Sequence, residues 1–189
     1  NLAIFYITID DKQVSVVDPD TRLNTITNAA KAHSYGVELQ LQAKPITGLD
    51  VYASFGYNQS KFEDFISTSW NSSYTDVVSE NMEGNYLQYA PVYTYNAGVQ
   101  YRSASGFMGR IDLFGTGKFY GDAANKAEQE AYQLVNVRLG YEGKKWEAYL
   151  WSKNLFDQEY LTWLSPSGSN LWALDGPPRT IGVTVSYRF

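Results

Sequence analysis

The sequence contains no cysteine and a single histidine, His33. The missing thiols exclude a disulfide framework, a thiolate nucleophile and a zinc–thiolate site, and one imidazole cannot build a metal cluster alone. Lysine and arginine number 15 against 20 aspartates and glutamates, which gives a formal net charge of −5. An acidic chain lacks the cationic surface that phosphate backbones require, so we expect no nucleic-acid partner.

Long apolar runs and a leader segment are also missing. No stretch approaches the roughly 18 consecutive apolar residues that mark a transmembrane helix. The chain opens without a signal peptide, on a strand-like segment at residues 1–6. We therefore expect either a mature chain or a C-terminal fragment, and we favour the fragment.

Aromatic residues are abundant instead. They make up 16% of the chain, whereas charged residues make up 19%, below the roughly 25% of soluble globular chains. The mean hydropathy is nonetheless −0.36, so the apolar residues must be interleaved with polar ones. This combination predicts strands with one apolar face and one polar face.

Apolar and polar residues alternate repeatedly, which places them on opposite faces of β-strands. In the last segment, Ile181, Val183, Val185, Tyr187 and Phe189 alternate with Gly182, Thr184, Ser186 and Arg188. The same pattern predicts strands over 35–43, 49–57, 93–101, 135–141 and 146–153, with less regular ones over 3–9 and 109–115. The chain is therefore predicted to contain about eight strands.

The connections alternate between short and long. Residues 45–48, 103–106 and 142–145 contain the Gly, Pro and Ser of tight hairpins, whereas longer polar segments occupy about 18–27, 66–84, 122–130 and 162–177. This asymmetry is typical of outer-membrane barrels, which have brief periplasmic turns and longer extracellular loops. We predict an all-β fold, an antiparallel transmembrane β-barrel segment whose strands continue beyond the membrane on the outer side. Aromatic girdle positions are expected at Tyr93, Tyr101, Tyr141, Trp146, Tyr187 and Phe189.

Two other architectures also contain alternating strands. A soluble ligand-binding barrel of lipocalin type would expose the apolar outward bands to water. A complete small eight-stranded outer-membrane barrel with a structural or adhesion role would need a self-complementary interior. In the predicted register Gly36, Gly56, Gly98, Gly140 and Gly182 all face inward, which favours a wider barrel.

Four segments resemble TonB-dependent outer-membrane receptors of the siderophore type. They are NAAKAHSYGVELQLQAKP at 28–45, YAPVYTYNAGVQYR at 89–102, SKNLFDQEYLTW at 152–163 and GPPRTIGVTVSYRF at 176–189. The resemblance covers essentially the whole chain in family order. It implies a bacterial outer-membrane protein with a 22-stranded barrel and an N-terminal plug. Residues 1–189 would be the last eight strands, without the plug, the TonB box and the earlier wall.

The closing strand resembles a C-terminal signal for the barrel-assembly machinery, carried by Val183, Val185, Tyr187 and Phe189. A free strand edge can be captured by strand addition, and an aromatic end residue would anchor that capture. A purely girdle role for Phe189 is compatible with this interpretation.

Catalysis is not indicated. The acid pairs, such as Glu63 with Asp64, are interpreted as solvated charge near strand ends, and His33 has no obvious nucleophile beside it in the sequence. We therefore expect no enzyme, no cofactor and no metal site.

The resemblance implies energised uptake of a ferric siderophore or related metal chelate, with TonB and outer-membrane lipid as further partners. Cobalamin, nickel chelates and oligosaccharides are alternative cargo for this fold. Loop aromatics would stack on the chelate, and lumen-facing arginines would attract an anionic one. The candidate residues are Trp70, Tyr74, Phe119, Tyr120, Trp163, Trp172, Arg110 and Arg138. Alternatively, the two arginines pair with Glu38, Asp112, Glu147 or the plug.

Overall fold

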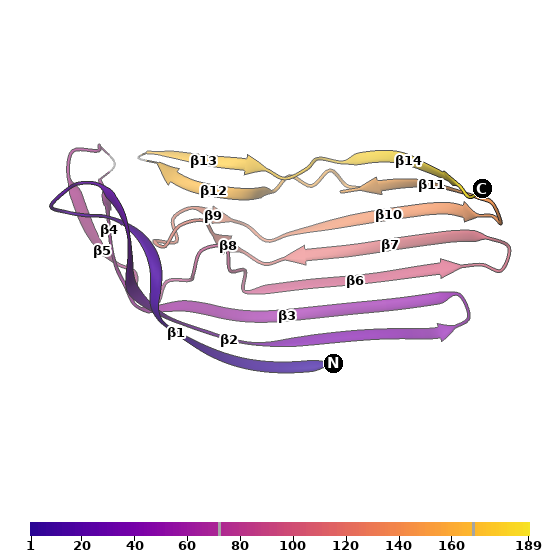
Figure 1. Ribbon diagram of the computed structural model, residues 1–189, viewed down its shortest axis with the longest axis horizontal. Coiled ribbons are helices and arrows are strands. Elements are labelled where there is room, and N and C mark those ends of the chain that lie inside the picture. The colour runs from indigo at the N-terminus through magenta and orange to yellow at the C-terminus, as the bar shows by residue number, and fades with distance from the viewer. Residues whose placement is uncertain (72, 168) are drawn as a thin grey trace.

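The computed structural model describes residues 1–71, 73–167 and 169–189. Eight long strands form one antiparallel sheet in the order β1-β2-β3-β6-β7-β10-β11-β14, so each strand lies beside the next long strand in the chain (Figure 1). The predicted count of eight antiparallel strands is confirmed. The strands are β1 (Leu2–Val17), β2 (Asn24–Ile46), β3 (Leu49–Asp64), β6 (Tyr93–Arg102), β7 (Phe107–Thr116), β10 (Tyr132–Glu142), β11 (Trp146–Lys153) and β14 (Thr180–Tyr187).

Short and long connections lie at opposite ends of the sheet, as predicted (Figure 1). Three of the long connections contain hairpins where the sequence predicts polar loops. These are β4 (Ile66–Trp70) with β5 (Val77–Asn81), β8 (Phe119–Tyr120) with β9 (Glu128–Gln129), and β12 (Leu161–Ser167) with β13 (Asn170–Asp175). These strands have two to seven residues, which is too short for alternation to stand out among their many polar residues.

The strand register confirms the predicted faces. Directly opposite residues in an antiparallel pair point to the same face. Val51 pairs with Val99, Val99 with Ile111, and Ile111 with Val137, so one apolar row crosses four strands. We call this apolar face outward and the opposite face, which carries Gly98, inward.

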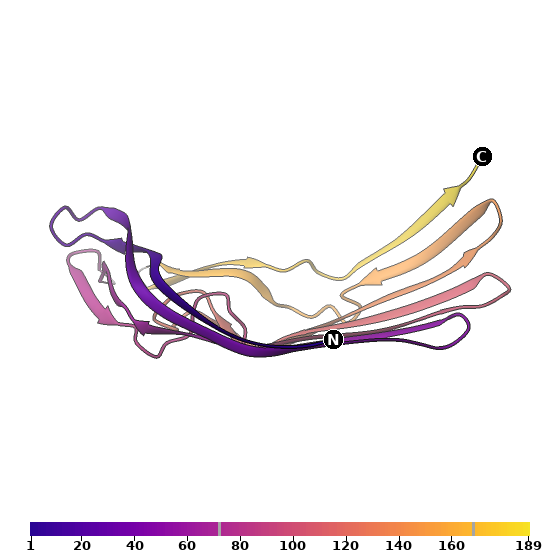
Figure 2. The ribbon, with the colours of Figure 1, turned by 60° about the horizontal axis from the view of Figure 1, so that its bottom comes forward.

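The eight-stranded sheet is open and curved. Strands β1 and β14 form its two edges, and each pairs with one neighbour within the described residues (Figure 2). The alternative of a small barrel that closes with eight strands is therefore not what the chain forms. No helix among the described residues is long and apolar enough to cross a membrane.

Two aromatic rows bound the outward face. Near the short turns, Phe107 packs edge-on against Tyr141, and Tyr141 packs against Trp146. Near the long connections, Tyr93 pairs with Tyr57. Along β6, the eight steps from Tyr93 to Tyr101 span about 26 Å at 3.3 Å per residue, close to the roughly 25 Å apolar band of such barrels. The outer row consists of Tyr6, Tyr35, Tyr57, Tyr93 and Tyr95, and the inner row of Tyr101, Phe107, Tyr141, Trp146 and Tyr187.

The wall continues past the outer aromatic row, as predicted. Strand β2 is 23 residues long, about twice the 9–11 residues needed to cross a bilayer. The N-terminal part of β2, before Tyr35, rises with β1 and β3 at the end of the sheet that carries the long connections (Figure 2).

Candidate ligand-binding site

Side chains of the long connections form hydrogen bonds with backbone groups of neighbouring connections. The Asn125 amide nitrogen donates to the Tyr86 carbonyl at 3.0 Å, and the Tyr86 N–H donates to Asn125 Oδ1 at 2.8 Å. Tyr89 Oη donates to the Leu164 carbonyl at 2.6 Å. Residues 85–89, 120–129 and 161–164 are thereby joined into one rim.

The rim packs on the inward face of the extended wall. Ala32 pairs with Phe62 in unbroken register with the inward Gly36, so Phe62 also points inward. Its ring lies 4.9 Å from that of Phe65 in the β3–β6 connection. Ala30, Phe62, Phe65 and Met82 form one buried cluster, against which Val14, Val16, Leu87, Ala123 and Ala124 pack. The connections therefore fold inward over the lumen side of the wall.

A cavity of about 750 Å³ lies between this wall and the rim. Such a volume suits a drug-sized ligand. Its walls come from residues 12–15 of β1, which we call upper β1, and from the β4–β5 hairpin, Met82, Gln88, residues 122–126 and Pro166. Besides buried-cluster residues, its lining includes Lys12, Gln13, Ser15, Ser67, Ser69, Trp70, Asn71, Glu80, Asp122 and Lys126.

The cavity lining is mainly polar, with one indole. Lys126 Nζ donates to the Glu80 carboxylate at 2.8 Å, and Asp122 Oδ1 accepts the backbone N–H groups of Lys126 and Ala127 at 3.0 and 2.7 Å. Lys12 has no carboxylate partner among the ion pairs of the described residues. Within the described residues, the cavity therefore offers the ammonium of Lys12, which has no carboxylate partner, and several neutral polar groups, with Trp70 in its wall.

The six predicted loop aromatics are not brought together. Trp70 lines the cavity, and Tyr74 lies 56% exposed on the same hairpin, with its hydroxyl 3.0 Å from Ser167 Oγ. Phe119 is buried in a second cluster with Ala127 and Leu164. Its neighbour Tyr120 points to the opposite face of β8, as strand alternation requires.

Trp163 and Trp172 also lie away from the cavity. Trp163 pairs with Leu174, and Trp172 pairs with Ser165, so both tryptophans share the face of the β12–β13 hairpin opposite to the buried Leu164. They are 42% and 63% exposed.

The two predicted arginines lie in mid-wall on the inward face. Arg110 Nε donates to Asp112 Oδ2 at 2.8 Å, and Arg110 Nη2 donates to Tyr52 Oη at 2.8 Å. Arg110 thus pairs with Asp112, one of its expected partners, which lies two residues further on the same strand. The Arg138 guanidinium lies 3.7 Å from the Tyr149 ring centroid, and its buried Nε has no hydrogen-bond partner in the described part of the chain.

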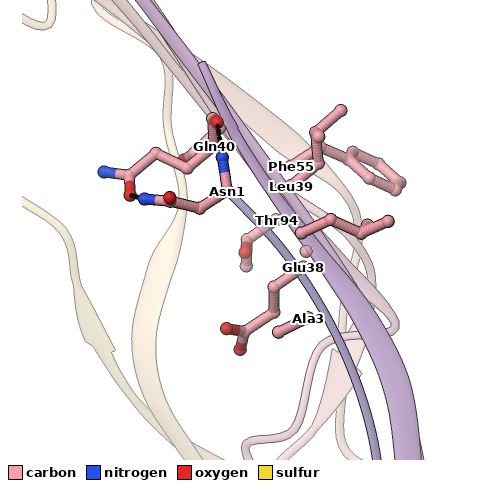
Figure 3. Close-up of a pocket in the computed structure, with 10 residues that line it drawn as sticks. Asn1, Ala3, Glu38, Leu39, Gln40, Phe55 and Thr94 are labelled. Atoms are coloured by element: carbon pink, nitrogen blue, oxygen red, sulfur yellow. Dashed lines mark hydrogen bonds between the residues drawn. The ribbon is translucent and has the colours of Figure 1, made fainter. Parts of the chain in front are cut away.

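A second hollow, of about 330 Å³, lies at the free edge of β1. Ala3 and Glu38 lie on one side of the strands there, whereas Leu39 and Phe55 lie on the other (Figure 3). The Asn1 amino group donates to the Gln40 carbonyl at 2.8 Å across this edge. We assign this hollow to the unpaired strand edge and not to ligand binding.

The role of upper β1 is not apparent from the sequence alone. Alternation breaks at Asp10–Asp11, one of the acid pairs that the sequence alone suggests are solvated charge. In the structure Asp11 has φ of 54°, and the register shifts between Ile9 and Lys12. A break in alternation with adjacent polar residues is the sign of a β-bulge. This bulge re-aims Lys12, which pairs with the buried Ala30, toward the cavity.

Three residues of the predicted assembly signal lie on the edge strand β14, and Phe189 follows two residues after its end. Val183 pairs with Leu150, Val185 with Ala148, and Tyr187 with Trp146, all on the outward face. The Phe189 ring packs edge-on against Tyr187 at 5.3 Å.

Metal ligands do not gather anywhere in the described chain. No group of three or more His, Cys, Asp or Glu side chains is placed to hold a metal ion among these residues.

A comparison with known families identifies the wall. A family model described as "TonB dependent receptor-like, beta-barrel" matches residues 1–155. The chain belongs to the TonB-dependent receptors. Members of this family are outer-membrane β-barrels that act as receptors and transporters rather than enzymes, so the localisation and the non-enzymatic class are both as expected.

Curated relatives extend the match to the C-terminal strands. The pesticin receptor of Yersinia pestis is 26% identical over 191 residues, which covers 99% of this chain and 26% of the receptor. The ferrioxamine receptor of Yersinia enterocolitica is 27% identical over 169 residues, which covers 85% of this chain and 21% of the receptor. The chain thus spans about a quarter of the length of these TonB-dependent receptors.

Solved structures share the fold. The ferric yersiniabactin uptake receptor FyuA from Yersinia pestis superposes with a TM-score of 0.79 at 25% identity, over 97% of this chain and 26% of that one. The siderophore receptor PiuA from Acinetobacter baumannii gives a TM-score of 0.77 at 21% identity, over 97% and 25%. The open eight-stranded sheet therefore corresponds to part of a larger barrel wall.

Proposed function

We propose that residues 1–189 form the last eight strands of a 22-stranded TonB-dependent receptor. The receptor takes up a ferric siderophore or a similar metal chelate across the outer membrane, with energy supplied through TonB. The plug and the TonB box belong to parts of the receptor outside this chain. Support comes from the family match, from relatives whose names include ferrioxamine and ferric yersiniabactin, and from the open edges of the sheet.

The observation that best supports binding of a chelate is the 750 Å³ cavity between upper β1 and the rim. A chelate presents a polar surface with amide, hydroxamate, carboxylate or aromatic groups. The Trp70 ring offers a stacking face, Lys12 offers an unpaired positive charge, and the Ser and Asn side chains donate hydrogen bonds. Because the rim is joined by side-chain hydrogen bonds, the cavity exists before a ligand arrives.

Iron-limited growth tests the uptake. A strain that lacks the gene is supplied with single chelates, including ferrioxamine and ferric yersiniabactin, and compared with the complemented strain. We expect at least one chelate to support growth only in the complemented strain and only when TonB is present. If no iron chelate distinguishes the two strains, the iron-uptake proposal is wrong.

Binding to the complete receptor tests the site. Trp70→Ala should weaken binding of the active chelate about tenfold, since stacking contributes up to about 1.5 kcal/mol beyond buried area. Trp172→Ala is the matched control, because Trp172 is exposed on the hairpin face that points away from the cavity. Equal losses in the two variants would contradict the assignment of the cavity.

A further inference from the structure

A second candidate site lies on the outward face, just beyond the outer aromatic row. It consists of His33 on β2, Lys61 on β3, Tyr86 in the β3–β6 connection, and Lys118 and Tyr120 at β8. We call these five residues the cation–tyrosine belt. Neither the transport function nor the cavity uses them.

The belt is a continuous stack of cations and rings. Lys61 Nζ lies 4.7 Å from the Tyr86 ring centroid, and the Tyr86 and Tyr120 rings are stacked at 6.0 Å. Lys118 Nζ lies 5.7 Å from the Tyr120 centroid. Positive charge over an aromatic face is favourable. The stack therefore presents an ammonium at each end of two tyrosine rings.

Register places this stack on the outward side of the wall. Lys61 pairs with His33, Gln59 pairs with Tyr35, and Tyr57 pairs with Val37, in unbroken order. Tyr57 belongs to the outer aromatic row, and Lys61 lies four residues further on the same face, about 13 Å along the strand. The belt thus lies at the level where lipid headgroups meet the barrel.

The charges of the belt leave one cation without a carboxylate. His33 Nδ1 lies 2.9 Å from the Glu63 carboxylate, and Lys118 Nζ lies 3.2 Å from that of Glu128. The hydrogen bond to Glu128 raises the pKa of Lys118 above its ordinary value. Among the ion pairs of the described residues, none includes Lys61.

We propose that the cation–tyrosine belt binds the phosphorylated headgroup of an outer-leaflet glycolipid. Lys61 holds one phosphate, Lys118 contributes a second cation, and the flat faces of Tyr86 and Tyr120 pack against the sugar. Below the belt the outward surface is apolar, with Tyr35 37% exposed and Phe55 43% exposed, so acyl chains continue along the lipid-facing wall. A glycolipid is the proposed occupant because the belt adjoins the lipid interface and because Lys61 has no carboxylate partner among the described residues there. This lipid site depends on the barrel wall and is independent of the proposed chelate uptake.

The test uses the complete receptor, purified in detergent and titrated with diphosphoryl lipid A in native mass spectrometry. Each basic residue near a lipid surface contributes on the order of fivefold in affinity. Lys61→Gln should weaken lipid A binding about fivefold. Lys118→Gln should weaken it less, because Lys118 already pairs with Glu128, and the double variant should lose more affinity than either single variant. Lys61→Arg should retain binding because it keeps the charge.

Two controls make the outcome decisive. Lys144→Gln removes one exposed lysine from the short turn at the opposite end of the wall and should change lipid A binding less than twofold. Phosphatidylcholine binding should be the same in all variants. If the double variant binds lipid A like the parent, or if Lys144→Gln loses as much, the belt is not a lipid site. If phosphatidylcholine and lipid A lose affinity equally, phosphate recognition is wrong.

Discussion

The Tyr52 ring on β3 lies over Gly98 on β6, in the space that a side chain at position 98 would fill. The two residues are directly opposite in the sheet, and a Cβ on Gly98 would lie 2.2 Å from Tyr52 Cζ. The same arrangement places Tyr149 over Gly140 and Trp151 over Gly182. At these three inward glycines, an aromatic ring from the neighbouring strand therefore fills the space of the missing side chain.

Gly98→Ala should destabilise the barrel. The Tyr52 hydroxyl contacts Asp112 and accepts a hydrogen bond from Arg110, so the ring cannot move aside without losing these bonds. We expect a loss of about 1–3 kcal/mol in the free energy of unfolding, the usual cost of overpacking, measured by urea titration of the refolded receptor. Gly56→Ala is the control, because its Cβ would meet only Thr94 Oγ1 at 3.4 Å. Equal effects at both positions would contradict the role of the Tyr52 ring.

Val183→Asp tests the outward register. Val183 pairs with Leu150 on the lipid-facing side and is 68% exposed. A carboxylate there should cost about 2 kcal/mol or more, or block assembly, on the scale of charged residues near the bilayer midplane. Heat-modifiable mobility on gels reports the folded fraction. Thr184→Asp places the same charge on the inward face of β14 and should be tolerated better; the reverse order would invert the register.

Deletion of Phe189 should slow insertion in cells. The ring packs against Tyr187 at the end of the edge strand, where it would anchor capture by the barrel-assembly machinery. Pulse–chase labelling of the folded receptor would show a longer half-time. Phe189→Trp should restore the parent rate because an aromatic end residue is kept. A normal rate in the deletion variant would remove the signal assignment and leave Phe189 as a girdle aromatic.

The β1–β2 tip should loosen in acid. The Asp18 carboxylate accepts the backbone N–H groups of Thr21 and Asp20, each at 2.9 Å, and these bonds hold the pKa of Asp18 below its ordinary value of 3.8. A lowered folded-state pKa stabilises the turn above the unfolded value, and this contribution is lost as the pH falls through the folded value. Hydrogen-exchange protection at positions 20 and 21, corrected for intrinsic rates, should fall as the pH drops below the ordinary carboxyl value of 3.8.

Asp18→Asn is the control for this titration. An asparagine side chain keeps the acceptor oxygen but does not ionise in this range. Protection in the variant should therefore be independent of pH. If parent and variant lose protection together, a group other than Asp18 controls the tip.

The amino-acid sequence by itself determined the wall. Side chains alternate between faces in any strand, so the order of Val183, Thr184 and Val185 decides which residues meet lipid without knowledge of the neighbours. The three short turns and the inward glycines were equally visible, because each is a local property. The family resemblance added the strand count of the whole receptor, which stays a proposal for this chain.

Only the tertiary structure decided the site. Lys12, Trp70 and Lys126 are far apart in the sequence, and they line one cavity because the connections fold inward and Asn125 joins two of them through the backbone of Tyr86. The neighbours Phe119 and Tyr120 look equivalent in sequence, yet one is buried beneath the rim and the other stacks on the outward side. Short polar segments carry no periodic signal of their own, so their conformation and exposure depend on what packs against them.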